Sequence, residues 1–244
     1  MTARVPTVGL IVPPADGRVP DDGPLLYQGR VRFLARGLGI GAVAPDGFNP
    51  VIDGVLEHAR ELRRAGADII SLMGTSISFY RGAGFTETLR AAMAEVTGVP
   101  CTTMSHAIVR ALRQLGIRRV AIATSYIDEL NERLVEYLAG SGFTVTALES
   151  LPMTGIDEIR QVSTGTLVAL ASRAWERSPG ADGIFISCGG LLTLEAIRRL
   201  EDRFGVPVTA SSPAGFWDVV RLAGADPCSP GHGRLFERTE PPAS

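Results

Sequence analysis

The stretch Gly66–Ser76, GADIISLMGTS, recurs further along the chain as Gly180–Gly190, GADGIFISCGG. Each copy is a short apolar run that ends in small side chains and a hydroxyl or a thiol. This pattern predicts a buried strand that turns directly into a helix. Cys188 in the second copy stands where the first copy has Gly74, so the copies share a structural pattern but differ in chemistry.

The repeat extends beyond these strands. Gly98-Val99-Pro100 is echoed by Gly205-Val206-Pro207, and the run from Val8 to Pro14 is echoed by Val120 to Tyr126. Between them, short β-branched runs alternate with helical patterns, which favours parallel strands joined by right-handed crossovers. We therefore expect an α/β fold made of two pseudo-symmetric, doubly wound lobes.

The lobe boundaries follow from the repeat. We expect a first lobe over residues 1–115, a second over 116–226, and a C-terminal tail of little fixed structure over 227–244. Part of the helix near the end of the second lobe is expected to pack back on the first. The glycines of Gly37–Gly41 are expected in a loop that follows a helix, and without a preceding strand they do not form a dinucleotide-binding fingerprint.

The composition narrows the classes of function. The chain has 244 residues, 45% of them hydrophobic, which is ample for a buried core. The 24 positive and 26 negative side chains give a formal charge of −2 without a basic run, so neither nucleic acid nor a membrane is an expected partner. The sequence contains no lysine, which excludes an internal Schiff base and the usual attachment of pyridoxal phosphate.

Cysteine and histidine positions indicate neither a disulfide framework nor a metal site. The three cysteines stand far apart, at Cys101, Cys188 and Cys228. The three histidines, His58, His106 and His232, lack the spacing of metal ligands. With no signal peptide or long apolar run in the sequence, we expect a cytoplasmic protein without a metal.

Ligands of open α/β sheets bind beyond the carboxyl ends of the strands, and the polar motifs of this chain fall at such ends. These motifs are Pro13-Pro14, Gly74-Thr75-Ser76, Thr124-Ser125-Tyr126, Cys188-Gly189-Gly190 and Ser211-Ser212. We therefore expect the site to lie in a cleft between the lobes.

Cys188 is the strongest candidate for a chemical role. Its position after a strand and before two glycines places the thiol beside exposed backbone amides. The alternative is a small buried hydrophobe, as most free cysteines are. That alternative is the better description of Cys101, which we expect in the core, whereas Cys228 is expected to be incidental.

Neutral hydrogen-bond donors gather around the same expected cleft. Thr75, Ser76, Tyr126 and the amides of Cys188 and Gly189 would together form a cradle for a carboxylate. Neutral donors can hold a carboxylate and still stabilise further negative charge, as an enediolate requires.

Other polar residues have simpler explanations. Asp68 and Asp182 begin strands on the side away from the cleft, so a role in turn formation is favoured. For His106, a surface or capping role is favoured over lining the cleft.

Five segments together indicate a family. They are Val8–Pro14, Ser71–Ser76, Tyr126–Asp128, Ser187–Leu192 and Ser211–Trp217. Through them the chain resembles the arylmalonate decarboxylases, cofactor-independent members of the aspartate/glutamate/hydantoin racemase superfamily, over nearly its whole length.

The resemblance implies a role for each matching residue. Cys188 matches the proton donor, and Thr75, Ser76, Tyr126 and Gly189 match the group that holds the remaining carboxylate. Gly74 occupies the position of a second cysteine in racemising relatives. The apolar pocket around the departing carboxylate corresponds to Pro14, Ile40, Val43, Ile77, Met153 and Ile156, with Phe48 and Ile159 beside them.

The implied reaction is decarboxylation of aryl- or alkenylmalonates, without a cofactor, to one enantiomer of a 2-substituted propionate. The expected partner is a small dicarboxylate, and the expected state is a monomer or small homo-oligomer. Two alternatives remain open. One is a racemase or cis-trans isomerase of the same superfamily, acting on an amino acid or maleate; the other is a non-catalytic carboxylate-binding protein.

Overall fold

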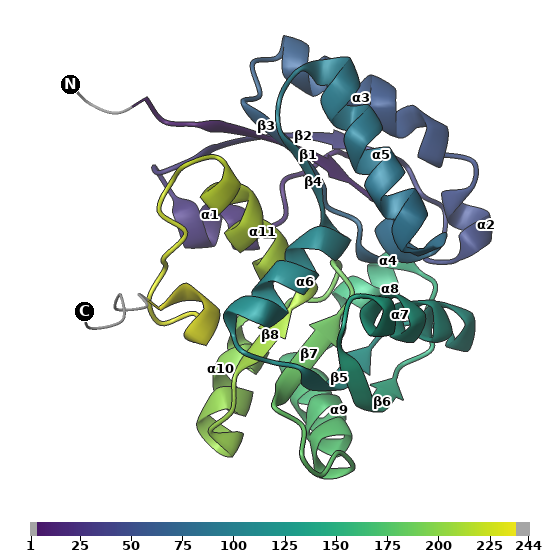
Figure 1. The fold of residues 1–244 in the computed structure, drawn as a ribbon, viewed down its shortest axis with the longest axis vertical. Helices are drawn as coiled ribbons and strands as arrows, with labels where there is room; N and C mark the ends of the chain where they lie inside the picture. Colours follow the sequence, from purple (N-terminus) through teal and green to yellow (C-terminus); the bar gives the residue numbers. More distant parts are fainter. Residues whose placement is uncertain (1–3, 238–244) are drawn as a thin grey trace.

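The computed structural model describes residues 4–237 and contains two four-stranded parallel sheets (Figure 1). The first sheet has the order β2-β1-β3-β4, with β1 at Thr7–Val12, β2 at Arg32–Gly37, β3 at Ile69–Leu72 and β4 at Cys101–Thr103. The second has the order β6-β5-β7-β8, with β5 at Arg119–Thr124, β6 at Thr144–Ser150, β7 at Gly183–Ser187 and β8 at Val208–Ala210. The matching strand orders confirm the two pseudo-symmetric lobes.

Helices connect the strands and cover the sheets. In the first half they are α1 Asp22–Tyr27, α2 Pro45–Phe48, α3 Val55–Arg64, α4 Thr75–Phe79, α5 Gly82–Thr97 and α6 Met104–Gln114, with a 3-10 turn at Ile52–Gly54. In the second half they are α7 Asp128–Gly140, α8 Ile156–Arg160, α9 Thr164–Glu176, α10 Leu194–Phe204 and α11 Ser211–Leu222, with a 3-10 turn at Arg234–Phe236. Figure 1 shows α3 and α5 on one side of the first sheet, with α1 and α11 on the other.

The repeated strands of the sequence are the central strands of the two sheets. All side chains of β3 and β7 are buried, because helices pack on these strands: α3 and α11 on β3, and α9 and α11 on β7. Asp68 and Asp182, at the opposite ends, accept hydrogen bonds from backbone amides of the neighbouring strands: Thr7 N donates to Asp68 at 2.9 Å, and Arg119 N to Asp182 at 2.8 Å. These carboxylates therefore stabilise the sheet ends away from the site.

The loop Gly37–Gly41 follows a strand and not a helix, so that expectation is wrong. It leaves β2, which pairs with β1 from Thr7↔Arg32 to Val12↔Gly37. As an edge strand, β2 is mostly half-buried, and Arg36 at its end reaches Glu61 on α3 at 3.0 Å. The mixed charged and apolar residues of β2 do not form a strand-like pattern in the sequence. The strand forms because it pairs with the distant strand β1.

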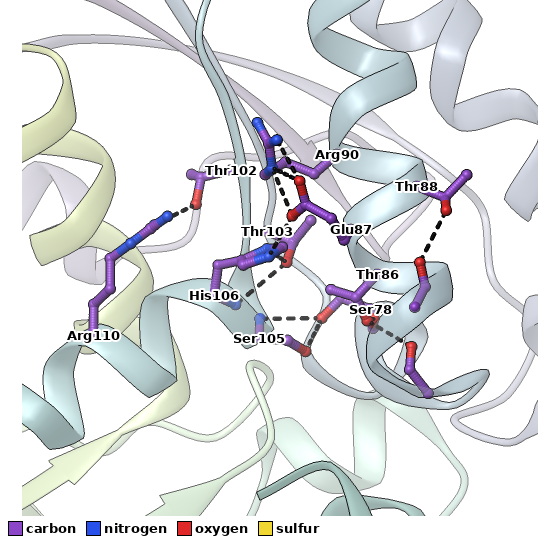
Figure 2. A network of polar contacts seen from close by, with 12 residues as sticks. Ser78, Thr86, Glu87, Thr88, Arg90, Thr102, Thr103, Ser105, His106 and Arg110 are labelled. Atoms are coloured by element: carbon purple, nitrogen blue, oxygen red, sulfur yellow. Dashed lines mark hydrogen bonds and ion pairs between the residues drawn. The ribbon is translucent and has the colours of Figure 1, made fainter. Parts of the chain in front are cut away.

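Helix α11 begins at the end of the second sheet but packs against α6 and β3 of the first half. Asp218 on α11 is fully buried and accepts a hydrogen bond from Arg110 on α6 at 2.6 Å. Thr102 of β4 also donates to Asp218, at 3.1 Å, and Figure 2 shows Arg110 reaching Thr102 as well. A charge-assisted cluster therefore joins the two halves at their interface.

The segment after α11 differs from the expected loose tail over its described part, residues 227–237. Leu235 and Phe236 are buried in the core, and the Tyr27 hydroxyl donates to the carbonyl of Pro227 at 3.0 Å. The prolines and glycines of this segment suggested little structure, but its two large apolar side chains cover α11. Residues 238–244 lie outside the described residues.

None of the helices within residues 4–237 combines the length and apolar character needed to cross a bilayer.

We expect Asp218→Ala to lower the free energy of unfolding by about 3 kcal/mol, because it removes the buried acceptor of hydrogen bonds from Arg110, Thr102 and also Arg221. Urea denaturation of the two proteins measures this difference. Glu195→Ala, which removes an exposed pair with Arg199, is the control and should have little effect. Equal effects of the two substitutions would contradict a stabilising role for the interface cluster.

Candidate active site

A cavity of about 110 Å³ opens where the carboxyl ends of β1, β3 and β7 converge. This volume suits a small substrate rather than a drug-sized ligand. The residues that line it come from both halves of the chain: Val12, Pro13, Pro14, Asp16, Arg18, Val19, Pro20, Asp21, Asp22, Ile40, Val43, Phe48, Met73, Gly74, Thr75, Ser76, Ile77, Ile156, Ile159, Arg160, Cys188, Gly189, Gly190, Leu191, Leu192 and Ser212.

The structure brings nearly all of the candidate residues to this one cavity. Only Tyr126 and Met153 are missing from its lining. Tyr126 is fully buried behind the Cys188 loop, where the Ser187 hydroxyl donates to its phenol oxygen at 3.3 Å. Met153 lies on the segment before α8, and its amide donates to the carbonyl of Ser125 at 3.2 Å.

Cys188 has an unusual backbone. Its φ is +143°, and no other non-glycine residue in the described chain has a positive φ. Such a conformation costs about 1–3 kcal/mol and persists only when the surroundings impose it. The strand before it is fully buried and the thiol itself is 6% exposed, so the turn holds the sulfur at the cavity wall.

The surroundings keep the Cys188 thiol protonated. Burial raises the pKa of Cys188, because the thiolate would lose its hydration. The Ser125 hydroxyl, the Gly190 amide and the Tyr126 hydroxyl oppose this shift without reversing it. At neutral pH the group is therefore an acid with a proton to donate.

Thr75 and Ser76 face the thiol from the other half of the molecule. They form the first turn of α4, directly after β3. A Cβ atom built on Gly189 would lie 3.5 Å from Thr75 Oγ1, so the two loops meet at this point. Thr75 Oγ1 is buried without a hydrogen-bond partner, and the Gly189 amide donates to no other described residue. These are donors that a bound carboxylate could satisfy.

The Cys188 amide, which the sequence places in the same cradle, has a protein partner in this structure, so its role toward a carboxylate stays a prediction. It donates to the Ser211 hydroxyl at 3.3 Å, at the start of α11.

Burial, and next the charge of an ionised Cys188, raise the pKa of Tyr126 well above its ordinary value. The phenol therefore stays neutral. Ser187 is the donor in its contact with Tyr126, so the phenol proton remains available for another acceptor.

Gly74 leaves the first-half side of the cavity without a thiol, and little space remains for one. A Cβ atom at this position would lie 2.4 Å from Ile77 Cγ2 and 3.2 Å from Pro13 Cγ. The branched side chain of Ile77 thus occupies the place that corresponds to the side chain of Cys188.

Apolar side chains from both halves form the rest of the wall. Ile40, Val43 and Phe48 come from the first half, and Ile156 and Ile159 come from α8 in the second. The amide of Val43 donates to the carbonyl of Thr154 at 2.8 Å, which holds the two loops together. One side of the cavity is therefore apolar and the other carries the neutral donors.

Sequence reasoning missed the charged part of the rim, which is made of the segment Asp16–Asp22 and Arg160. Asp22 is buried, and burial raises its pKa, although a hydrogen bond with Ser212 opposes the shift. The available signal was position: this segment directly follows β1, whose carboxyl end lies at the cavity.

The remaining candidates stay away from the cavity. Thr103 caps α6 by accepting from the His106 amide, and His106 Nε2 lies 3.1 Å from a Glu87 carboxylate oxygen. Figure 2 shows these residues together, with Glu87 on α5 and His106 on α6. Cys101 is buried in the core beside Thr97. No group of three or more histidine, cysteine or acidic side chains in residues 4–237 is arranged to hold a metal ion.

Comparison with known proteins gives a consistent result. A sequence family described as "Arylmalonate decarboxylase" matches residues 8–236. The arylmalonate decarboxylase of Bordetella bronchiseptica is 56% identical over 97% of this chain and 99% of its own length. The maleate isomerase of Nocardia farcinica is 27% identical over 95% of each chain. A liganded double mutant of arylmalonate decarboxylase superposes with a TM-score of 0.92, at 55% identity over 95% of this chain and 99% of that one.

The backbone of Cys188 predicts an unusual order of stabilities. We expect Cys188→Gly to be more stable than Cys188→Ala by about 1–2 kcal/mol, because both lose the thiol but only glycine adopts this φ without strain. Urea denaturation measures the difference. At Ala123, inside β5, replacement by glycine should instead be destabilising. An alanine variant at position 188 that equals the glycine variant would rule out backbone strain there.

Proposed function

The chain belongs to the arylmalonate decarboxylase family, and on this premise we propose how its residues carry out the reaction. The protein is a carboxy-lyase that removes CO2 from arylmalonates. The observation that carries the proposal is a single buried, protonated thiol facing unpaired neutral donors across one cavity.

The substrate binds with its two carboxylates in different surroundings. The carboxylate that remains is held by the hydroxyls of Thr75 and Ser76 and by the Gly189 amide. The Tyr126 phenol lies behind these groups, next to Cys188, and supports the cradle from there. The carboxylate that departs lies against the apolar side chains on the opposite wall, which include Ile40, Val43, Ile77, Ile156 and Ile159. Since Met153 does not line the cavity, we assign it a supporting position behind this wall.

Cleavage is driven by charge that moves toward the neutral donors. As CO2 leaves, the electron pair of the broken C–C bond spreads onto the retained carboxylate and the aryl group as an enediolate. Donors that already point at this group stabilise the new charge, and each contributes about 3 kcal/mol in comparable sites. The apolar wall opposes solvation of the departing carboxylate, which makes its loss as neutral CO2 more favourable.

Cys188 then delivers its proton to the α-carbon. The raised pKa of Cys188 keeps it in the acid form that this step requires. Because Gly74 supplies no thiol on the other face, protonation occurs from one side and the product is a single enantiomer. A racemase or isomerase of the same superfamily would need a second acid-base group, and this cavity has none at that position.

The free thiols bear on the cellular location of the protein, and the cavity volume bears on the range of its substrates. The thiols of Cys101 and Cys188 are free, which favours a reducing compartment such as the cytoplasm. The size of the cavity favours monocyclic aryl or alkenyl groups.

The direct test is incubation of metal-free protein with phenylmalonate and with 2-methyl-2-phenylmalonate. We expect CO2 release from both substrates and one enantiomer of 2-phenylpropionate from the second, as measured by chiral chromatography. Racemic product would contradict protonation from one face, and tight binding without CO2 release would indicate a carboxylate-binding protein.

Cys188→Ala should reduce kcat/KM by about 10²–10⁴-fold, because the carbanion loses its positioned acid. Binding of phenylacetate, the product formed from phenylmalonate, should be unchanged when measured by calorimetry. Cys101→Ala is the control and should retain turnover, since this thiol lies in the core. Normal turnover by Cys188→Ala would disprove the assigned role.

A thiol at position 74 should allow the enzyme to racemise 2-arylpropionates, provided that the side chain of residue 77 leaves room for it. Gly74→Cys alone clashes with Cγ2 of Ile77, whereas Ile77→Leu removes that β-branch at nearly constant volume. We expect the double variant Gly74→Cys/Ile77→Leu to racemise faster than Gly74→Cys.

Adding Cys188→Ser to the double variant should reverse product handedness in the decarboxylation, because only the thiol on the opposite face remains. Chiral chromatography of the products measures both effects. Unchanged handedness would mean that position 74 does not reach the second face of the intermediate.

A further inference from the structure

Ser125 is the immediate neighbour of Cys188 across the second sheet. Strands β5 and β7 are paired in parallel, and their last register partners are Thr124 and Ser187. The residue that follows β5 is Ser125, and the residue that follows β7 is Cys188. Adjacent strands lie about 4.8 Å apart, so the hydroxyl and the thiol begin from neighbouring backbone positions.

The polar groups around Ser125 are satisfied, but its own hydroxyl is not. Thr124 donates to Asn131 at 2.7 Å, and Asn131 donates to the carbonyl of Tyr126 at 3.1 Å. The carbonyl of Ser125 accepts from Met153 N. Ser125 Oγ, however, is buried without a partner, in a residue that is 1% exposed. Such a group is normally avoided because it loses its hydration without compensation.

The missing partner is the ionised form of the neighbouring thiol. A neutral thiol is a weak acceptor, whereas a thiolate is a strong one. Ser125 is accordingly the strongest of the groups that lower the pKa of Cys188 against the effect of burial, ahead of the Gly190 amide and the Tyr126 hydroxyl. The contact is therefore weak in the resting enzyme and strengthens as charge develops on the sulfur.

We infer that Ser125 is a positioning residue for proton delivery, whose hydroxyl donates to Cys188 Sγ when the thiol gives up its proton. The inference rests on the proposed role of Cys188 as proton donor. In this step the S–H bond breaks, its electron pair stays on sulfur, and the proton forms a C–H bond with the enediolate carbon. The thiolate is held by Ser125 until water returns a proton to it.

A purely structural role for Ser125 would not depend on the charge of the thiol. The proposed hydrogen bond, in contrast, is strong only with the Cys188 thiolate that the proton transfer leaves. An interaction made in the transition state and absent in the ground state raises turnover without tightening substrate binding. Loss of the hydroxyl should therefore act on the thiol and on kcat, and leave KM unchanged.

The test compares Ser125→Ala with the unmodified enzyme. Hydrogen bonds to charged groups predict about a tenfold fall in kcat with unchanged KM, and about a tenfold fall in the acid dissociation constant of the Cys188 thiol. The thiolate absorbance as a function of pH reports this constant, with Cys188→Ala as the blank that removes the signal of the other cysteines. Ser125→Thr, which keeps the hydroxyl, should restore both values.

Tyr126 is the other titratable group next to the thiol. The charged groups lining the cavity are Asp16, Arg18, Asp21, Asp22 and Arg160. The unmodified enzyme and the Ser125 variants all contain these groups, so the effects of these groups on the thiol are the same in each protein. Ser71→Ala is the matched control, because Ser71 on β3 also carries a buried hydroxyl without a partner but does not line the cavity.

Folding of each variant is checked by circular dichroism, and Ser125→Gly serves as a second removal of the hydroxyl if the alanine variant does not fold. Unchanged kcat after loss of the hydroxyl would overturn the inference, as would a fall in kcat without a change in the thiol constant or an equal effect of Ser71→Ala. If Cys188→Ala itself retains turnover, the proposed function fails, and that result is distinct from a failure at Ser125.

Discussion

The parallel direction of the strands is the constraint on which the rest of this structure depends. Within each sheet all carboxyl ends lie at one edge, and the two sheets present these edges to the same cavity. Cys188 at the end of β7 therefore meets Thr75 and Ser76 at the end of β3. The buried contacts of Asp218 between α11 and α6 hold the two halves in the arrangement that makes this meeting possible.

Around the cavity the protein keeps features that a well-packed core usually lacks. The hydroxyls of Thr75 and Ser125 are buried without partners, and Cys188 has a backbone conformation suited to glycine. Each costs about 1–3 kcal/mol. In the proposed reaction these costs have a use, because donors that were already bonded to protein groups could not respond to charge that appears only as CO2 leaves.

The asymmetry between the two halves determines the direction of the chemistry. The duplicated strands β3 and β7 would allow a thiol at each end, as an acid and a base on opposite faces of a substrate require. Gly74 removes one of these thiols, and the Ile77 methyl fills the space. In the proposed reaction no base is needed to form the carbanion, so a single acid is sufficient in this relative of the maleate isomerases.

The sequence by itself determined the two-lobed arrangement, the central strands and the polar ends of the strands at the cavity, because strand and helix periodicities are local and parallel strands bring their carboxyl ends together. The apolar part of the cavity lining was predicted only through the family resemblance. The tertiary structure alone decided which donors stay unpaired. That Ser211 engages the Cys188 amide, that Tyr126 lies behind the cavity wall and that Asp16–Asp22 joins the rim all depend on contacts between distant segments. The edge strand β2 escaped detection for the same reason, since its hydrogen bonds and its burial come from a neighbour that local sequence does not specify.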